Sequence, residues 1–245
     1  MRSIVLSVAA ILTMASVVSA ESQKKDVDVK ATDGVSLKGT YFSAGRSGPA
    51  MLLLHQCNMD RHAWDGLAKD LADAGINVLT FDFRGYGESG GDRLTDPAAR
   101  RAVTLEKWPG DVDAAYMYLL TQKGVDKSRV AAGGASCGVG QSSELATRHQ
   151  EIKTLVLLSG TASDAAKTHI TQTSALAIFG AASEEDTAPA AGIKAAVEAS
   201  KNSQSMIKIY GGKEHGVPMF AKNPELEPMI VTWLKTRLLS KGQTH

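Results

Sequence analysis

The sequence predicts an α/β fold in which a mainly parallel central sheet is flanked by helices. Short apolar runs alternate with amphipathic segments along most of the chain, which is the order of elements that builds parallel sheets with helical crossovers. Residues 50–54, Ala-Met-Leu-Leu-Leu, are apolar without interruption, as expected of a strand that is covered on both faces. Near the N-terminus, an alternating pattern on both sides of Asp33-Gly34 predicts a β-hairpin instead.

Periodicity and the positions of glycine and proline predict where each element lies. Gly75 ends the first helix, and Pro109 fits the first turn of the second. Two polar stretches, residues 92–107 and 160–173, are expected to be loops that help to form a pocket. We expect strands at residues 27–29, 35–41, 50–54, 76–81, 130–133, 154–158, 175–179 and 206–210, and helices at 61–74, 109–122, from the serine turn at 136 to about 149, 188–200 and 224–239.

Length and composition favour one globular domain of ordinary character. A chain of 245 residues, 43% of them hydrophobic, can bury a substantial core without disulfides or metals. The net charge of +1 implies no general attraction to nucleic acid or to acidic membranes. The connections after the last three core strands are short, so we expect no large cap domain.

The first twenty residues resemble a secretory signal peptide rather than part of the fold. Arg2 gives a positive start, residues 4–18 are mostly apolar, and Val18-Ser19-Ala20 has the small residues of a cleavage site. The apolar run is short for a membrane span, although an uncleaved anchor is the alternative. We therefore expect a single mature domain at residues 21–245 that is periplasmic or secreted and has no stable membrane span.

The rest of the chain is organised around residues 130–140, Val-Ala-Ala-Gly-Gly-Ala-Ser-Cys-Gly-Val-Gly. A buried strand ends here at Ser136, and a helical pattern follows at once. Gly134 and Gly138 permit a sharp turn from strand to helix, because a Cβ at either position would collide with the neighbouring chain. The turn would lift the Ser136 hydroxyl clear of the sheet, at the positive end of the helix dipole.

A serine nucleophile needs a base and a carboxylate, which in a parallel sheet follow later strands. His215 meets the first need, since it lies five residues after a predicted strand in a glycine-rich loop. Asp186 is the preferred acid because its short side chain can curl back over the sheet from the far end of its loop. The sequence leaves three other carboxylates open as alternatives, namely Asp164, Glu184 and Glu185.

Two backbone N–H groups are expected to stabilise the negative charge that develops on the substrate carbonyl oxygen. One belongs to Cys137, directly after the nucleophile, and the other to the loop after residue 54, most naturally Cys57. Because both cysteines border this oxyanion site, their side chains are candidates for a disulfide after export. Two free buried thiols are the alternative.

These features resemble the α/β-hydrolase superfamily over nearly all of the mature chain. His55-Gln56-Cys57 is similar to the superfamily's His-Gly oxyanion loop, with Gln56 in place of the glycine. Residues 82–89 resemble its Asp-x-Arg-Gly-x-Gly-x-Ser stretch, which is chiefly structural. The resemblance implies the triad Ser136, Asp186 and His215 with Cys57 and Cys137 as oxyanion donors, and the short layout is similar to small carboxylesterases and dienelactone-hydrolase-like members.

In dienelactone-hydrolase-like members the nucleophile is a cysteine, so Cys137 is a rival to Ser136. The glycine spacing favours Ser136, because counting two positions from Cys137 reaches Ala135 and the β-branched Val139, which would crowd the turn.

The sequence thus predicts a serine hydrolase that cleaves a small-molecule carboxylic ester through an acyl-enzyme, without a metal or organic cofactor. An amidase or peptidase would use the same triad and is the nearest alternative. A non-catalytic binding module on the same scaffold is the alternative from another class, since a fold does not guarantee activity.

Overall fold

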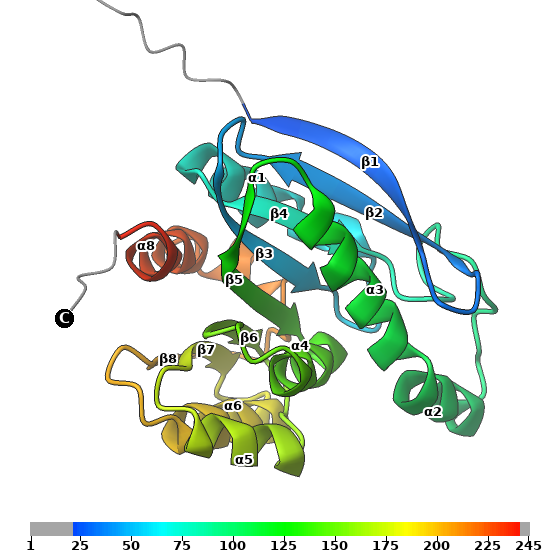
Figure 1. Cartoon of the computed structure of the whole chain (residues 1–245). Coiled ribbons are helices and arrows are strands. Elements are labelled where there is room, and N and C mark those ends of the chain that lie inside the picture. The colour runs from blue at the N-terminus through cyan, green and yellow to red at the C-terminus, as the bar shows by residue number, and fades with distance from the viewer. Residues whose placement is uncertain (1–21, 241–245) are drawn as a thin grey trace, which may run out of the picture.

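The computed structural model describes residues 22–240, in which a central sheet lies between two layers of helices (Figure 1). The expected signal segment, residues 1–20, lies outside this range. None of the helices within it is long and apolar enough to cross a bilayer.

The sheet formed by the described residues has eight strands in the order β1-β2-β4-β3-β5-β6-β7-β8. Every neighbouring pair from β4 to β8 is parallel, whereas β1 and β2 are antiparallel to each other and β2 is antiparallel to β4. The predicted hairpin and mainly parallel sheet are therefore confirmed. The strands are β1 (Gln23–Lys30), β2 (Ser36–Ser43), β3 (Gly48–Leu54), β4 (Asn77–Phe81), β5 (Val125–Ala135), β6 (Thr154–Leu158), β7 (Ala177–Ser183) and β8 (Met206–Tyr210).

Helices cover both faces of the sheet. On one face lie α1, α7 and α8, and on the other lie α3, α4, α5 and α6 (Figure 1). The helices are η1 (Arg61–Trp64, one 3-10 turn), α1 (Asp65–Ala74), α2 (Pro97–Glu106), α3 (Trp108–Thr121), α4 (Cys137–Arg148), α5 (Asp164–Gln172), α6 (Thr187–Ala199), α7 (Met219–Lys222) and α8 (Leu226–Leu238).

The apolar run of β3 explains why both faces need a cover. Its side chains alternate, so that Leu52 and Leu54 enter the core beneath α3 and α4, whereas Met51 and Leu53 enter the core beneath α1 and α8. All four are fully buried. The strand thus lies at the centre of the molecule, and the loop that follows Leu54 emerges at the rim where the other parallel strands also end.

Two helices correct the sequence-based expectation of loops. Residues 92–107 contain α2, and residues 160–173 contain α5. Helix α2 has no fully buried residue. Within residues 22–240 no large cap domain interrupts the fold, as expected.

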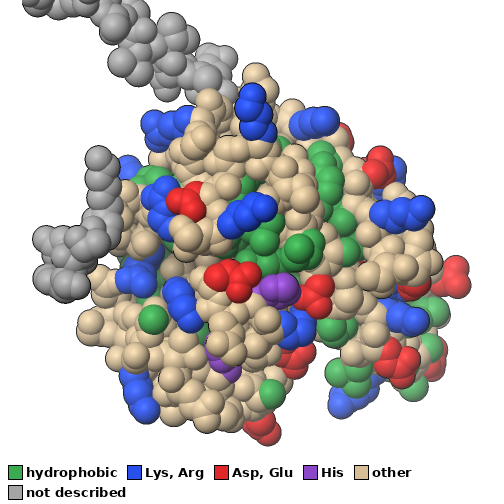
Figure 2. Space-filling model, viewed as in Figure 1, with side chains coloured by type: hydrophobic (Ala, Val, Ile, Leu, Met, Phe, Trp, Pro, Cys, Tyr) green, Lys and Arg blue, Asp and Glu red, His purple; other side chains and the backbone are tan. Residues whose placement is uncertain are grey.

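Charge is mixed on the visible surface. Figure 2 shows basic and acidic side chains interspersed over this face, in keeping with the net charge of +1 for the whole chain. This face thus presents no extended field of one sign that would attract a polyanion.

Candidate active site

Ser136 occupies a sharp turn between β5 and α4. Its backbone has φ 53 and ψ −117, a conformation in the positive-φ region that few non-glycine residues adopt. The glycines on both sides are required by close approach: a Cβ on Gly134 would lie 2.2 Å from the Gly138 carbonyl oxygen, and one on Gly138 would lie 2.4 Å from that of Leu54. Neither position therefore has room for a Cβ, as the sequence predicts.

The turn is fixed to the neighbouring strand on its other side. The Ser136 N–H donates to the Leu158 carbonyl at 2.9 Å, at the end of β6. Gly160 lets the next loop pass close, because a Cβ there would lie 2.6 Å from the Ser136 carbonyl oxygen. Ser136 itself is half-buried, so its position is open to small molecules from the solvent.

His215 and Asp186 form a hydrogen-bonded pair at the same rim of the sheet. The imidazole Nδ1 lies 2.7 Å from Asp186 Oδ2, and the two residues come from the loops after β8 and β7. Asp186 stands at the start of α6 but its side chain caps no backbone N–H of that helix. Its carboxylate is thus available to hold the imidazole.

The other three carboxylates considered from the sequence have different surroundings. Asp164 begins α5 on the surface and pairs with Lys167 at 2.7 Å, and the Lys167 ammonium holds the pKa of the Asp164 carboxyl below its usual range. Glu184 and Glu185 use their backbone N–H groups to bind the carbonyls of Tyr210 and Gly212. Among the four candidates, Asp186 has the hydrogen bond to His215.

The loop that carries His215 lies against the serine turn. A Cβ built on Gly216 would be 3.3 Å from the Ala135 Cβ, and Ala135 directly precedes Ser136. On its other side the loop is tied to the end of β7, where the Ser183 hydroxyl donates to the Glu214 carbonyl at 2.7 Å. The loop that carries the imidazole is therefore held from two sides and passes beside the serine turn.

The loop after β3 is oriented by buried His55. Its Nε2 accepts from the Phe83 N–H at 3.0 Å, which places the ring proton on Nδ1, and Nδ1 donates to the Gln56 carbonyl at 2.8 Å. Burial lowers the pKa of His55, in keeping with a neutral ring. In a trans peptide the carbonyl and the next N–H point in opposite directions, so the Cys57 N–H faces away from the His55 ring.

Cys57 and Cys137 are joined by a disulfide, with their Cα atoms 5.9 Å apart. The bond links the loop after β3 to the first residue of α4, directly after Ser136. Of the two possibilities left open by the sequence, the structure therefore has the disulfide rather than two thiols. Because the Cys137 sulfur is bonded, it is not available as a nucleophilic thiolate.

The glycine-rich stretch after β4 is structural, as the resemblance implied. Asp82, fully buried, accepts from the Arg61 N–H at 2.7 Å and from its guanidinium at 2.5 Å. Arg84 donates to both carboxylate oxygens of Asp111, at 2.6 and 2.5 Å. These buried ion pairs fix the rim beside the candidate site, and neither involves the serine or the histidine.

Two residues that contribute to the site were not singled out by sequence reasoning. Ser183 binds the His215 loop, and Gln56, seen earlier only as a departure from glycine, binds the same loop through its side chain. No local motif announces either contact, since the partners lie 31 and 161 residues away.

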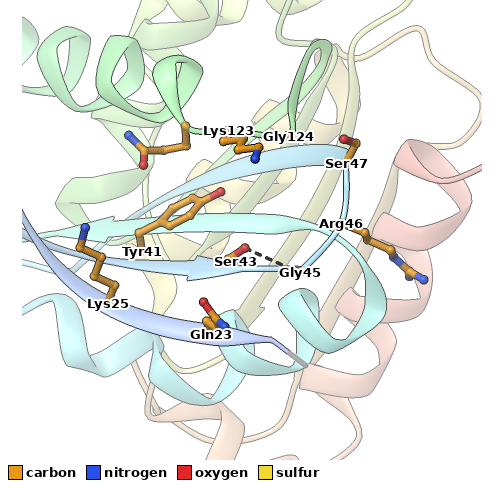
Figure 3. A pocket seen from close by; sticks show the side chains of 10 residues that line it. Gln23, Lys25, Tyr41, Ser43, Gly45, Arg46, Ser47, Lys123 and Gly124 are labelled. Carbon is orange, nitrogen blue, oxygen red and sulfur yellow. Dashed lines mark hydrogen bonds between the residues drawn. The ribbon is translucent and has the colours of Figure 1, made fainter. Parts of the chain in front are cut away.

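A separate groove lies at the opposite rim of the sheet. It has a volume of about 530 Å³ and includes Tyr41, Lys25 and Lys123 in its lining, whereas the Arg46 guanidinium turns away and donates to the Ala74 carbonyl (Figure 3). Within residues 22–240, no group of three or more His, Cys, Asp and Glu side chains is arranged to hold a metal ion.

Comparison with known proteins supports the fold and the family. Residues 49–204 match the family model described as alpha/beta hydrolase fold. The chain is 35% identical over 126 residues to the uncharacterized protein Rv2307c of Mycobacterium tuberculosis, covering 51% of this chain and 41% of that protein. It is 31% identical over 117 residues to the thiohydrolase aneE of Aspergillus aculeatus, covering 47% and 35%. The chain thus spans less than half the length of these relatives.

Among solved structures, the esterase Pf2001 of Pyrococcus furiosus is similar in fold, with a TM-score of 0.69 and 19% identity over 88% of this chain and 91% of that one. That similarity covers a larger share of the chain than the match to the sequence relatives does. With the family model matching well over half of the residues, the chain belongs to the α/β-hydrolase fold family.

Proposed function

We propose that the protein is a serine hydrolase that cleaves a small-molecule carboxylic ester through an acyl-enzyme. The observation that carries the proposal is the 2.7 Å contact between His215 Nδ1 and Asp186 Oδ2, on a loop that lies against the turn of Ser136. A nucleophile on a sharp turn, a base and a carboxylate that orients the base are the three parts that acyl transfer needs.

In this mechanism His215 Nε2 takes the proton from the Ser136 hydroxyl as the oxygen attacks the substrate carbonyl carbon. The proton then passes to the leaving alcohol, and an acyl-Ser136 ester remains. His215 next takes a proton from water, whose oxygen attacks the acyl carbon, and then returns that proton to the Ser136 oxygen as the carboxylic acid leaves. Asp186 holds the Nδ1 proton throughout, which keeps Nε2 free to act as the base.

The backbone N–H groups of Cys57 and Cys137 would stabilise the negative oxygen formed in each attack. The donor after the nucleophile stands at the start of α4, where the N–H groups of the first turn have no partner within the helix. The His55 contacts turn the Cys57 N–H away from the core. Losing one such donor costs on the order of 3 kcal/mol of barrier in related chemistry.

The proposal is tested by replacing Ser136 with Ala in the mature protein. Hydrolysis of a short-chain nitrophenyl ester should fall to the background rate, and a fluorophosphonate probe should label the wild-type protein but not S136A. A folded wild-type protein that the probe does not label would support a non-catalytic module instead.

A thioester is the second candidate substrate, because one relative is named a thiohydrolase and the acyl-enzyme step is the same with a thiol as leaving group. A panel of oxygen esters, thioesters and amides with one acyl group would rank these classes. A higher kcat/KM for the thioester than for the ester would move the assignment to a thiohydrolase, and a higher value for the amide would move it to an amidase.

We also propose that the chain is exported after cleavage behind Ala20. The Cys57–Cys137 disulfide supports this, since such bonds persist mainly in oxidising compartments. Mass spectrometry of the protein recovered from a bacterial periplasm should give a mature N-terminus at Glu21. An intact Met1 in that fraction would contradict the proposal.

A further inference from the structure

The Gln56 side chain forms a bridge between two loops that are distant in the sequence. It is almost fully buried, its Oε1 accepts from the Val217 N–H at 2.9 Å, and its Nε2 donates to Asn58 Oδ1 at 2.8 Å. The first bond spans 161 residues and joins the loop after β3 to the loop that carries His215.

The lack of a side chain at Gly216 leaves room for the side chain of Gln56. A Cβ at Gly216 would lie 2.2 Å from Gln56 Oε1, well inside van der Waals contact, and its φ of +71 is itself unfavourable for a residue with a side chain. The glycine directly after the histidine thus leaves the space through which Gln56 reaches the Val217 N–H. The two residues are fitted to each other across the site.

The neighbouring residue ties the same loop in the other direction. Cys57 is bonded to Cys137, the residue after Ser136. Gln56 and Cys57 therefore connect one short loop both to the segment of the base and to the segment of the nucleophile. A displacement of the histidine loop relative to the serine turn would have to break the Gln56 bond or move the covalently linked loop with it.

We propose that Gln56 is a positioning residue that sets the place of His215 relative to Ser136. The inference rests on the proposed function and goes beyond it, since Gln56 touches neither reacting atom. Its effect is transmitted through Val217 and Gly216 to the imidazole. Misplacement of a catalytic group by about 1 Å costs on the order of 100-fold in rate, so a single lost tether is sufficient to be measured.

The experiment compares three variants of the mature protein. Gln56→Met keeps the length of the side chain and removes both polar ends, whereas Gln56→Glu keeps an oxygen acceptor for the Val217 N–H. Gln122→Met is the matched control: Gln122 also donates a side-chain hydrogen bond, to the Tyr118 carbonyl at 3.1 Å, but it lines the groove at the opposite rim of the sheet.

Gln56→Met should lower kcat for an ester by about 10- to 100-fold with little change in KM, and should distort the pH profile of kcat/KM. Gln56→Glu should recover most of the lost kcat, and Gln122→Met should match the wild type. A purely structural role of Gln56 would lower the thermal stability of Gln56→Met without this pattern in kcat. Unchanged kcat in Gln56→Met, or equal losses in Gln56→Glu and Gln56→Met, would overturn the proposal.

A second readout does not depend on hydrolysis. The ring ¹⁵N chemical shifts of His215, measured by NMR, should move in Gln56→Met and stay in place in Gln122→Met. If the wild-type protein neither hydrolyses esters nor reacts with a fluorophosphonate, the proposed function fails, and these shifts still decide the role of Gln56. Identical His215 shifts in wild type and Gln56→Met would rule out positioning by Gln56.

Discussion

The carboxylate of Asp186 lies 2.7 Å from Nδ1 of His215, although 29 residues separate them in the chain. The contact follows from the sheet, because β7 and β8 are parallel neighbours and both loops leave at the same edge. A carboxylate at this distance fixes the orientation of the ring and stabilises it when it becomes charged.

The first prediction concerns this pair. Asp186→Asn should lower kcat by on the order of 10³- to 10⁴-fold, because an amide no longer stabilises the imidazolium and favours the wrong tautomer. Steady-state kinetics with a nitrophenyl ester provide the measurement. Asp164→Asn is the control, since that exposed carboxylate pairs with Lys167 and should be replaceable without loss. Equal effects of the two changes would remove Asp186 from its assigned role.

The second prediction compares the effect on stability of replacing two glycines of helix α4, Gly138 and Gly140. Gly138→Ala should lower the free energy of unfolding by about 1–3 kcal/mol or more, since its Cβ would overlap the Leu54 carbonyl oxygen at 2.4 Å. Gly140→Ala should be neutral or stabilising by about 0.5–1 kcal/mol, because its Cβ meets only the Thr161 oxygen at 3.7 Å. Urea unfolding of the two variants would show the difference. Similar stabilities would mean that the turn does not need the close approach seen here.

The third prediction concerns the disulfide. Replacing Cys57 and Cys137 together by Ala should cost about 4 kcal/mol of stability in the chain-entropy model, because the bond closes a loop of 80 residues. The backbone N–H groups remain in this variant, so any loss of kcat reports on how the bond holds them. Denaturation curves with and without reductant give the stability. Two reactive thiols in the unfolded, unreduced wild-type protein would show that the bond is not formed.

The fourth prediction concerns pH and His55. Burial lowers the pKa of its imidazole in the folded protein, so below about pH 6.5 the unfolded chain binds the proton more readily. The free energy of unfolding should therefore fall as the pH drops from about 7.5 to 5, and this contribution is constant at higher pH. His55→Gln should be less stable at neutral pH but should lose part of the acid-side slope. A slope unaffected by His55→Gln would contradict the assignment.

The sequence pattern was sufficient to place two short strands. The strands expected at residues 154–158 and 206–210 have these same bounds in the structure. The sequence pattern was less accurate for the bounds of β7, which continues through Gly180 to Ser183. That glycine looked like a break, but it provides room for α6, since a Cβ there would lie 2.7 Å from the side chains of Ile193 and Val197.

The two helices in the segments expected to be loops carry capping signals at their N-termini. Asp96 accepts from the Ala99 N–H at 2.7 Å, and Pro97 follows it at the first helical position of α2. Ser163 caps α5 by accepting from the Ala166 N–H at 3.2 Å. Both signals lie in the sequence and indicate helix starts in spite of the polar composition of these segments.

Some features of the site are set by neighbouring residues in the sequence, and others by contacts between distant loops. The serine turn could be predicted because its glycines and its nucleophile are contiguous, and His215 because it follows a strand. The bridge from Gln56 to Val217 depends on how two loops 161 residues apart face each other, which no local pattern encodes. The catalytic roles of Ser136, Asp186 and His215 stay predictions until the variants are measured.

The backbone angles of Ser136 have a consequence for stability. A side chain held at φ 53 and ψ −117 is strained by on the order of 1–3 kcal/mol relative to a relaxed residue, whereas glycine adopts such angles freely. Ser136→Gly should thus melt at a higher temperature than the wild type while being unable to form an acyl-enzyme. Ser136 would then lower the stability of the protein relative to glycine at the same position while providing the proposed nucleophile. Activity and stability would place opposite demands on this one residue.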